Sequence, residues 1–276
     1  MLKYHIKGMA YDEFSMTIFS RINRFPKNLV PCFETKDSDI DLILWLDDEI
    51  LTCNEYSKYN YATLTESAAI VPQTYEKFAN NFDSIIQNFN MIFTHSRELV
   101  NMHEKIKWIP ATATWIQEPR VREKSKKISM ITSTKNWAVG HKKRMELASS
   151  LSGKVDLYGR GINEIEFKEQ GLDDYMFSIA HENANYPGYF TEKILDCFST
   201  GTIPVYWGDP SIGEVFNTDG IILLDGKFDP EALTEDIYYS KMDAIKENCE
   251  IVKNNFMMVE DYIYDNYLKD LDDDLS

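Results

Sequence analysis

The chain has 276 residues, which is long for one domain and sufficient for two domains of about 100–150 residues each. Hydrophobic residues make up 43% and aromatic residues 13%, so the composition favours packed cores and excludes a largely disordered chain. The formal net charge of −16 excludes nucleic acid or an anionic membrane surface as the main partner, because phosphates would be repelled. A small phosphate-bearing ligand needs only a local group of donors and stays possible.

The first 25 residues contain no apolar signal-peptide core and no uninterrupted apolar span of about 20 residues. We therefore expect neither a signal peptide nor a transmembrane segment. The four cysteines are scattered without a CxxC pair, which is typical of reduced thiols. Together these features predict a soluble cytoplasmic protein, and the missing anchor favours a bacterial or viral source.

In the first half of the chain, short apolar runs rich in β-branched and aromatic residues predict strands, and Tyr75–Phe89 has the spacing of a helix. Strands that alternate with helices are typical of βαβ units and parallel sheets. The predicted strands are Leu2–Ile6, Asp41–Trp45, Tyr61–Leu64, Met91–Thr94 and Ile106–Ile109.

The most charged interior segment, Glu118–Lys127, lies near the middle of the chain and is predicted to link two domains. Residues 1–120 would form an N-terminal Rossmann-like domain and residues 121–276 a C-terminal one. Tandem α/β domains commonly bind a ligand at the carboxyl ends of their strands.

The second half repeats the alternation of strands and helices, with helices predicted at His141–Leu151 and Thr191–Thr200. From Glu231 to Leu268, apolar residues recur at steps of three and four, which predicts terminal helices that we assign to the C-terminal domain. An acidic tail, Asp270–Ser276, follows. The predicted strands are Ile128–Thr132, Val155–Tyr158, Met176–Ala180, Ile203–Trp207 and Gly220–Leu224.

The most informative segment is Met176–Asp209, a predicted strand, loop, helix and strand in series. Free N–H groups and the positive end of the helix dipole meet where the loop joins the helix, so this junction favours an anion. Lys193 lies in the first helical turn, where a cation needs an anionic partner that a diphosphate would supply. We expect Lys193 to be exposed when no ligand is bound.

The segment that carries these residues reads HENANYPGYFTEKILDCFSTGTIPVYWGDPSI, from His181 to Ile212. It resembles the signature of glycosyltransferase family 10, the α-1,3/1,4-fucosyltransferases. The upstream segment Val155–Arg160, VDLYGR, is also similar to a family motif. The resemblance covers most of the C-terminal half and only weakly the N-terminal half.

This resemblance implies a GT-B-type α/β fold, with two Rossmann-like domains that face each other across a cleft. It also implies an inverting transfer of fucose from GDP-fucose to a glycan hydroxyl, without a cofactor or a metal for donor binding. By position, Asn183, Tyr189, Glu192 and Lys193 would hold the donor, with Lys193 on the diphosphate. The implied partners are a nucleotide sugar and a glycan acceptor.

Two further residues are assigned by similarity to the family pattern. The family uses a strand-end glutamate of the N-terminal domain as general base, and Glu66 in Thr65-Glu66-Ser67 is the candidate here. The family also places an arginine near the start of the helix before the VDLYGR segment. Arg144 is our choice for that role, with Lys142 as the alternative.

Other readings remain open. His181 stands where the family usually has phenylalanine, so the same fold could use a different nucleotide-sugar donor. A catalytically silent sugar-nucleotide or glycan-binding protein is a second alternative. Asp37-Ser38-Asp39 matches the DxD pattern of metal-dependent transferases, but a three-residue pattern outside the donor motif is common by chance, and we reject it.

Overall fold

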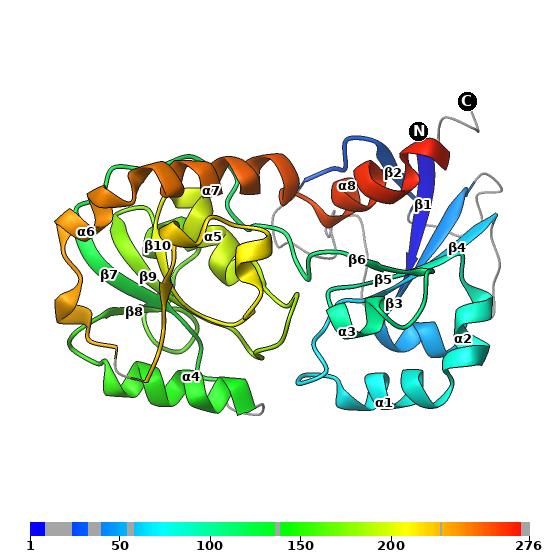
Figure 1. Cartoon of the computed structure of the whole chain (residues 1–276), viewed down its shortest axis with the longest axis horizontal. Coiled ribbons are helices and arrows are strands. Elements are labelled where there is room, and N and C mark those ends of the chain that lie inside the picture. Colours follow the sequence, from blue (N-terminus) through cyan, green and yellow to red (C-terminus); the bar gives the residue numbers. More distant parts are fainter. Residues whose placement is uncertain (9–23, 33–39, 54–57, 136–138, 227, 272–276) are drawn as a thin grey trace. The chain divides into compact units, whose positions relative to one another are not determined.

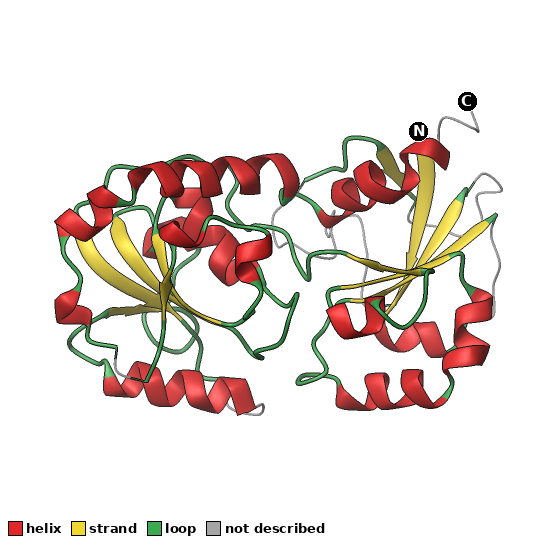
Figure 2. Cartoon of the chain, in the orientation of Figure 1, coloured by secondary structure: helices red, strands yellow, loops and turns green. Residues whose placement is uncertain are grey.

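The computed structural model describes residues 1–8, 24–32, 40–53, 58–135, 139–226 and 228–271. The chain divides into two compact units. Unit 1 comprises Met1–Ala113 and Met258–Ser276, and unit 2 comprises Thr114–Met257. Each unit has a parallel sheet with helices on both faces (Figure 1), and Figure 2 shows the same alternation of strands and helices along the chain.

Unit 1 contains a six-stranded sheet in the order β2-β1-β3-β4-β5-β6, and all of its neighbouring strands are parallel. The five strands predicted in this half are confirmed, and the three-residue strand β2 is an addition at the edge of the sheet. The strands are β1 (Leu2–Lys7), β2 (Leu29–Pro31), β3 (Leu42–Leu46), β4 (Tyr59–Leu64), β5 (Met91–Thr94) and β6 (Ile106–Trp108).

Both faces of this sheet are covered, which explains why all five residues of the apolar central strand β3 are buried. Along β3, Leu44 belongs to one core cluster and Trp45 to the other, as the two-residue period of a strand requires. The predicted helix Tyr75–Phe89 is two helices, α1 (Pro72–Asn80) and α2 (Phe82–Asn88), separated at Asn81. A short helix, α3 (Arg97–Val100), follows β5.

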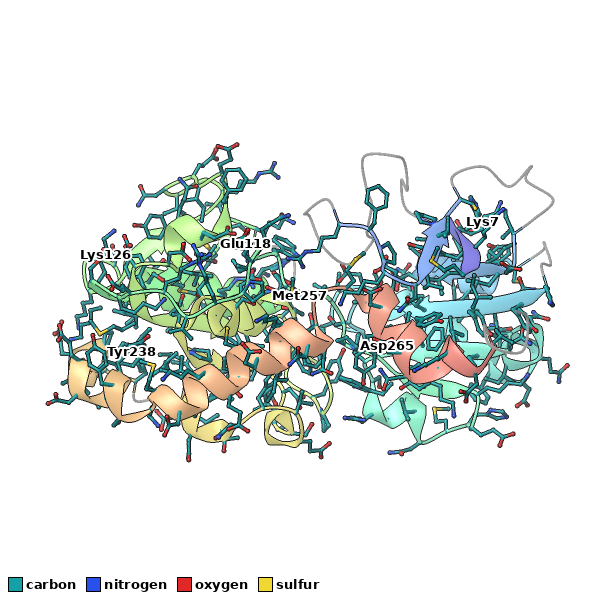
Figure 3. All side chains as sticks on the ribbon, turned by 90° about the horizontal axis from the view of Figure 1, so that it is seen from above. Lys7, Glu118, Lys126, Tyr238, Met257 and Asp265 are labelled. Carbon is teal, nitrogen blue, oxygen red and sulfur yellow. The ribbon has the colours of Figure 1, made fainter. Side chains whose placement is uncertain are left out.

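Unit 2 contains a five-stranded parallel sheet in the order β11-β10-β9-β7-β8. Its predicted strands are also confirmed, although β11 is shorter than expected. Figure 1 shows α4 on one side of this sheet and α5 and α7 on the other. The elements are β7 (Lys126–Ile131), α4 (Val139–Ser150), β8 (Asp156–Tyr158), β9 (Tyr175–His181), α5 (Glu192–Thr200), β10 (Ile203–Trp207), β11 (Ile222–Leu223), α6 (Glu235–Ser240) and α7 (Met242–Asn255). Side chains fill the interior of each unit (Figure 3).

The last helices differ from the expected domain division. Helix α8 (Val259–Ile263) and the π-helical turn Tyr264–Leu268 belong to unit 1, not to the domain that begins near residue 121. Val259, Ile263 and Leu268 are buried against the core that contains Leu2 and Leu44. The predicted linker Glu118–Lys127 lies within unit 2, because the chain enters that unit at Thr114. The apolar period predicts helices but does not identify the sheet that they cover.

Within the described ranges, no helix combines the length and apolar character needed to cross a lipid bilayer.

Candidate active site

The carboxyl end of β9 leads through a loop into α5, as the sequence predicts. All seven residues of β9 are buried, so the strand fixes the start of this loop firmly. Helix α5 begins after Thr191, whose hydroxyl accepts a hydrogen bond from the N–H of Lys193 at 3.4 Å. The helix ends at Gly201, whose φ of 72° is the left-handed conformation that glycine adopts without strain.

The fully buried carboxylate of Glu182 holds this loop against the start of α5. Its Oε1 accepts the backbone N–H of Thr191 at 2.9 Å, and its Oε2 accepts the Thr191 hydroxyl at 2.7 Å. A Cβ atom at Gly208 would lie 2.6 Å from the Cγ of Glu182, so the residue that follows β10 can pack this closely on the Glu182 side chain because it is glycine. Glu182 was part of the sequence motif, but its structural role was not predicted.

The ammonium group of Lys193 lies inside the site and is not free in solvent. Its Nζ is 3.3 Å from Oε2 of Glu182 and 3.4 Å from Oε1 of Glu192, and it donates to the Thr191 hydroxyl at 2.9 Å. The side chain is only 17% exposed, so the expectation of an exposed lysine was wrong. The reason is that the buried Glu182 needs a counter-charge. Burial acts to lower the pKa of Lys193, but the two carboxylates outweigh it and raise the pKa.

Glu192 is the second carboxylate at the start of α5. Burial alone would raise its pKa, but Lys193 and Lys168 together lower the pKa of Glu192 to about 2. The Nζ of Lys168 is 3.8 Å from Oε1 of Glu192 and 3.2 Å from Oδ2 of Asp196, one helical turn further along α5. Lys168 was not among the residues predicted from the sequence, because it reaches α5 from a separate element, the 3₁₀ turn Lys168–Gly171.

Arg144 joins α4 to the end of β9. Its guanidinium group donates from Nη1 to Oδ1 of Asn183 at 3.0 Å and to the carbonyl of His181 at 3.3 Å. Burial lowers the pKa of Arg144, and the nearby carboxylates of Glu182 and Glu192 oppose that effect. The alternative, Lys142, is exposed, so the structure brings Arg144 and not Lys142 to the loop.

The contact between α4 and this loop also depends on a glycine. A Cβ atom at Gly140 would lie 2.2 Å from the carbonyl oxygen of Asn183. The first turn of α4 therefore packs directly on the backbone of the loop, which keeps Arg144 within hydrogen-bonding distance of Asn183.

Aromatic rings complete the site. Tyr189 is 2% exposed and stacks on Tyr186, with the ring centroids 5.1 Å apart. His181 stacks on Trp207 at 4.3 Å, and its Nδ1 lies 2.8 Å from the carbonyl oxygen of Glu182. Burial lowers the pKa of His181 to about 4, so the ring is neutral at pH 7 and adds no positive charge. His181, one of the two rings in this stack, stands at the position where the family pattern has phenylalanine.

Unit 2 therefore brings together five residues of the predicted site: Arg144, Asn183, Tyr189, Glu192 and Lys193. The sixth, Glu66, lies in unit 1 directly after β4, and its side chain is exposed. Asp37-Ser38-Asp39 lies outside the described residues. Among the described residues no three acidic, histidine or cysteine side chains cluster as metal ligands would.

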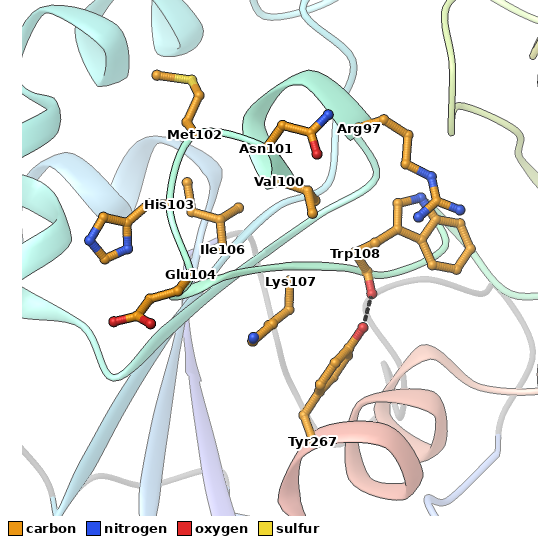
Figure 4. A pocket seen from close by; sticks show the side chains of 10 residues that line it. All are labelled: Arg97, Val100, Asn101, Met102, His103, Glu104, Ile106, Lys107, Trp108 and Tyr267. Carbon is orange, nitrogen blue, oxygen red and sulfur yellow. Dashed lines mark hydrogen bonds between the residues drawn. The ribbon is translucent and has the colours of Figure 1, made fainter.

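A separate hollow of about 660 Å³ lies in unit 1 beside β6 (Figure 4). Arg97 lies over the ring of Trp108, 4.6 Å from its centroid, and the hydroxyl of Tyr267 donates to the carbonyl of Trp108. None of the predicted site residues lines this hollow, so it carries none of the chemistry assigned from the sequence.

Comparison with known proteins adds independent findings. Residues 121–245 match the family model "Glycosyltransferase family 10 (fucosyltransferase) C-term". An α-(1,3)-fucosyltransferase FucT of Helicobacter pylori is 40% identical over 58 residues, which are 21% of this chain and 12% of that protein. An α-(1,3)-fucosyltransferase B of Drosophila melanogaster is 39% identical over 72 residues, 26% of this chain and 16% of that protein. The matched segments thus span less than a fifth of these relatives.

The fold has a counterpart over nearly the whole chain. A crystal structure of an α1,3-fucosyltransferase with GDP covers 98% of this chain and 89% of its own chain, with a TM-score of 0.53 and 16% sequence identity. At 16% sequence identity, the similarity shows only that the two proteins share a fold. It confirms the predicted GT-B-type α/β class, with two parallel sheets.

Proposed function

Because residues 121–245 match the family model of the glycosyltransferase family 10 (fucosyltransferase) C-terminal domain, we propose that the chain transfers fucose from GDP-fucose to a glycan hydroxyl with inversion. The observation that carries this proposal is the cluster of Arg144 and Lys193 beside the first turn of α5. It gathers two cations at a helix N-terminus, with the carboxylates of Glu182 and Glu192 as counter-charges, in a chain with a net charge of −16. Such a site suits a small anion and not an extended polyanion.

The residues of unit 2 have distinct parts in donor binding. Lys193 and Arg144 would face the diphosphate, whose negative charge grows as the bond to the sugar breaks. Glu192, which is ionised at neutral pH, can accept hydrogen bonds from the hydroxyl groups of the nucleotide sugar. Tyr189 and Asn183 would fix the donor's orientation, since both lie in the loop between β9 and α5. In the absence of donor, Glu182 and Glu192 hold the ammonium group of Lys193 in place.

The reaction also needs a base. The acceptor oxygen attacks the anomeric carbon from the face opposite the leaving GDP, so one C–O bond forms as the other breaks and the configuration inverts. The acceptor hydroxyl has a pKa far above neutral, and a carboxylate that takes its proton during the attack lowers the barrier. Glu66 is the residue proposed to take that proton.

Two alternatives can be tested against this proposal. The His181–Trp207 stack differs from the family pattern close to the donor loop, which favours testing other nucleotide-sugar donors. A catalytically silent binding protein would keep the donor residues without turnover, and release of free sugar or transfer product from GDP-fucose would exclude it.

The first prediction concerns the nucleotide. GDP is expected to raise the melting temperature of the protein more than UDP does at equal concentration. A ligand at a hundredfold excess over its Kd stabilises the folded state by about 2.7 kcal/mol. For a folding unit of 150–250 residues this corresponds to roughly 5–10 °C. The measurement is a thermal-shift series with GDP, UDP and ADP; stabilisation by UDP but not GDP would contradict the donor assignment.

The second prediction concerns metal ions. GDP binding is expected to survive EDTA, because Lys193 and Arg144 supply the positive charge that a divalent cation supplies elsewhere. Calorimetric titration of the protein with GDP, once in the presence of EDTA and once with added Mg²⁺, measures this directly. Loss of binding on chelation would reopen the role of Asp37 and Asp39.

A further inference from the structure

The carboxyl ends of two neighbouring strands in unit 1 hold the proposed base. Strands β3 and β4 are parallel, and Leu46 pairs with Thr63 in their register. Asp47 directly follows β3, and Thr65 and Glu66 directly follow β4. The aligned register places these three residues side by side at one edge of the sheet.

Asp47 accepts hydrogen bonds from the backbone and side chain of this turn. Its Oδ1 accepts the backbone N–H of Thr65 at 2.8 Å and that of Glu66 at 3.3 Å. Its Oδ2 accepts the hydroxyl of Thr65 at 2.6 Å. Both oxygens of Asp47 are therefore engaged, whereas the side chain of Glu66 is exposed to solvent.

The backbone of Glu66 is held from the opposite side as well. The hydroxyl of Tyr75, on α1, donates to the carbonyl oxygen of Glu66 at 3.0 Å. His95 directly follows β5 and is fully buried, and the backbone of Glu66 and of Thr65 acts to raise its pKa. Burial lowers the pKa of His95 to about 4, so at neutral pH it contacts the turn as a neutral ring.

The conformation of Asp47 is unusual for its residue type. Its φ is +45°, the one positive φ recorded outside glycine in the described part of the chain. Such a conformation costs about 1–2 kcal/mol for most residues with a side chain, and aspartate tolerates it better than most. A strained backbone persists where surrounding contacts fix it, and this often occurs at functional sites. Here the contacts that fix it are the three hydrogen bonds to the turn that carries Glu66.

We propose that Asp47 is a positioning residue, which fixes the Thr65–Glu66 turn so that the exposed Glu66 carboxylate is oriented toward the acceptor hydroxyl. This inference rests on the proposed function, in which Glu66 is the general base. Asp47 itself contacts no reacting atom, because its two oxygens are used within the turn. A general base that is misplaced by about 1 Å loses much of its effect on the rate of transfer, whereas the affinity for the donor does not depend on where the base lies.

The test compares variants of Asp47 in the full chain. Asp47→Ala is expected to lower kcat for fucosyl transfer by at least about tenfold, with the KM for GDP-fucose and the Kd for GDP unchanged. Asp47→Asn is expected to restore most of the rate, because an amide oxygen accepts both backbone N–H groups and its NH₂ can donate to the Thr65 hydroxyl. The matched control is Asp48→Asn, which removes the adjacent charge at a side chain bonded to Thr74 instead.

A double-mutant cycle separates positioning from general damage. In a Glu66→Gln background, Asp47→Ala is expected to cause no further loss, because the group that it positions has already lost its basicity. An additive loss, or a normal rate in Asp47→Ala alone, overturns the inference. If Asp47→Ala does not fold, as judged by circular dichroism, Thr65→Val tests the same contact, and a normal rate in that variant overturns it. A normal rate in Glu66→Gln would instead contradict the proposed function.

Discussion

Glu66→Gln is expected to lower kcat for transfer by about 10²–10⁴, the usual contribution of a positioned general base. The substitution keeps the size of the side chain and removes its basicity. Because Glu66 is exposed and its backbone bonds to Asp47 and Tyr75 do not involve the carboxylate, the fold of unit 1 should persist. The measurement is the steady-state transfer of labelled fucose to a glycan acceptor under saturating donor.

The control for this variant is donor binding. Glu66 belongs to unit 1, whereas Lys193 and Arg144 belong to unit 2, so the Kd for GDP should stay within about twofold of the wild-type value. A variant with near-normal transfer would remove Glu66 from the mechanism. The next glutamates to test would then be Glu76, which is exposed on α1, and Glu55, which lies outside the described residues.

The sequence predicts the strands and most helices because their signals are local. The continuous apolar run of β10, and the apolar period and end signals of α5, are local signals that tertiary packing did not override. The break at Asn81 was missed because the apolar spacing continues across it. The three-residue β2 is too short to carry a period at all.

The contacts within the site were less predictable, because they join residues from separate elements. The pairing of Lys168 with Glu192 depends on how the 3₁₀ turn Lys168–Gly171, which precedes β9, packs on α5. The burial of Lys193 depends on Glu182, eleven positions earlier in the sequence, which lies at the other end of the same loop. A motif indicates which residues matter, but the ion pairs that they form follow from the packed fold.

Lys193→Ala is expected to weaken GDP binding by at least about tenfold, which is about 1.4 kcal/mol and close to the lower end of the range of about 1.5–3 kcal/mol for a charged hydrogen bond. The same change should also destabilise unit 2, because the fully buried Glu182 loses its counter-charge. Glu182 keeps two hydrogen bonds from Thr191, so we expect a loss on the order of 1–3 kcal/mol. Calorimetric titration measures the first effect and thermal unfolding the second.

The double variant Lys193→Ala/Glu182→Gln separates these two effects. Glutamine is neutral, and its side-chain oxygen can still accept the N–H of Thr191, so much of the lost stability should return. The weak binding of GDP should remain, because the ammonium group that faces the diphosphate is still absent. If the double variant instead binds GDP normally, Lys193 serves only to neutralise Glu182, and the diphosphate must be held elsewhere, with Arg144 as the remaining cation that contacts the loop.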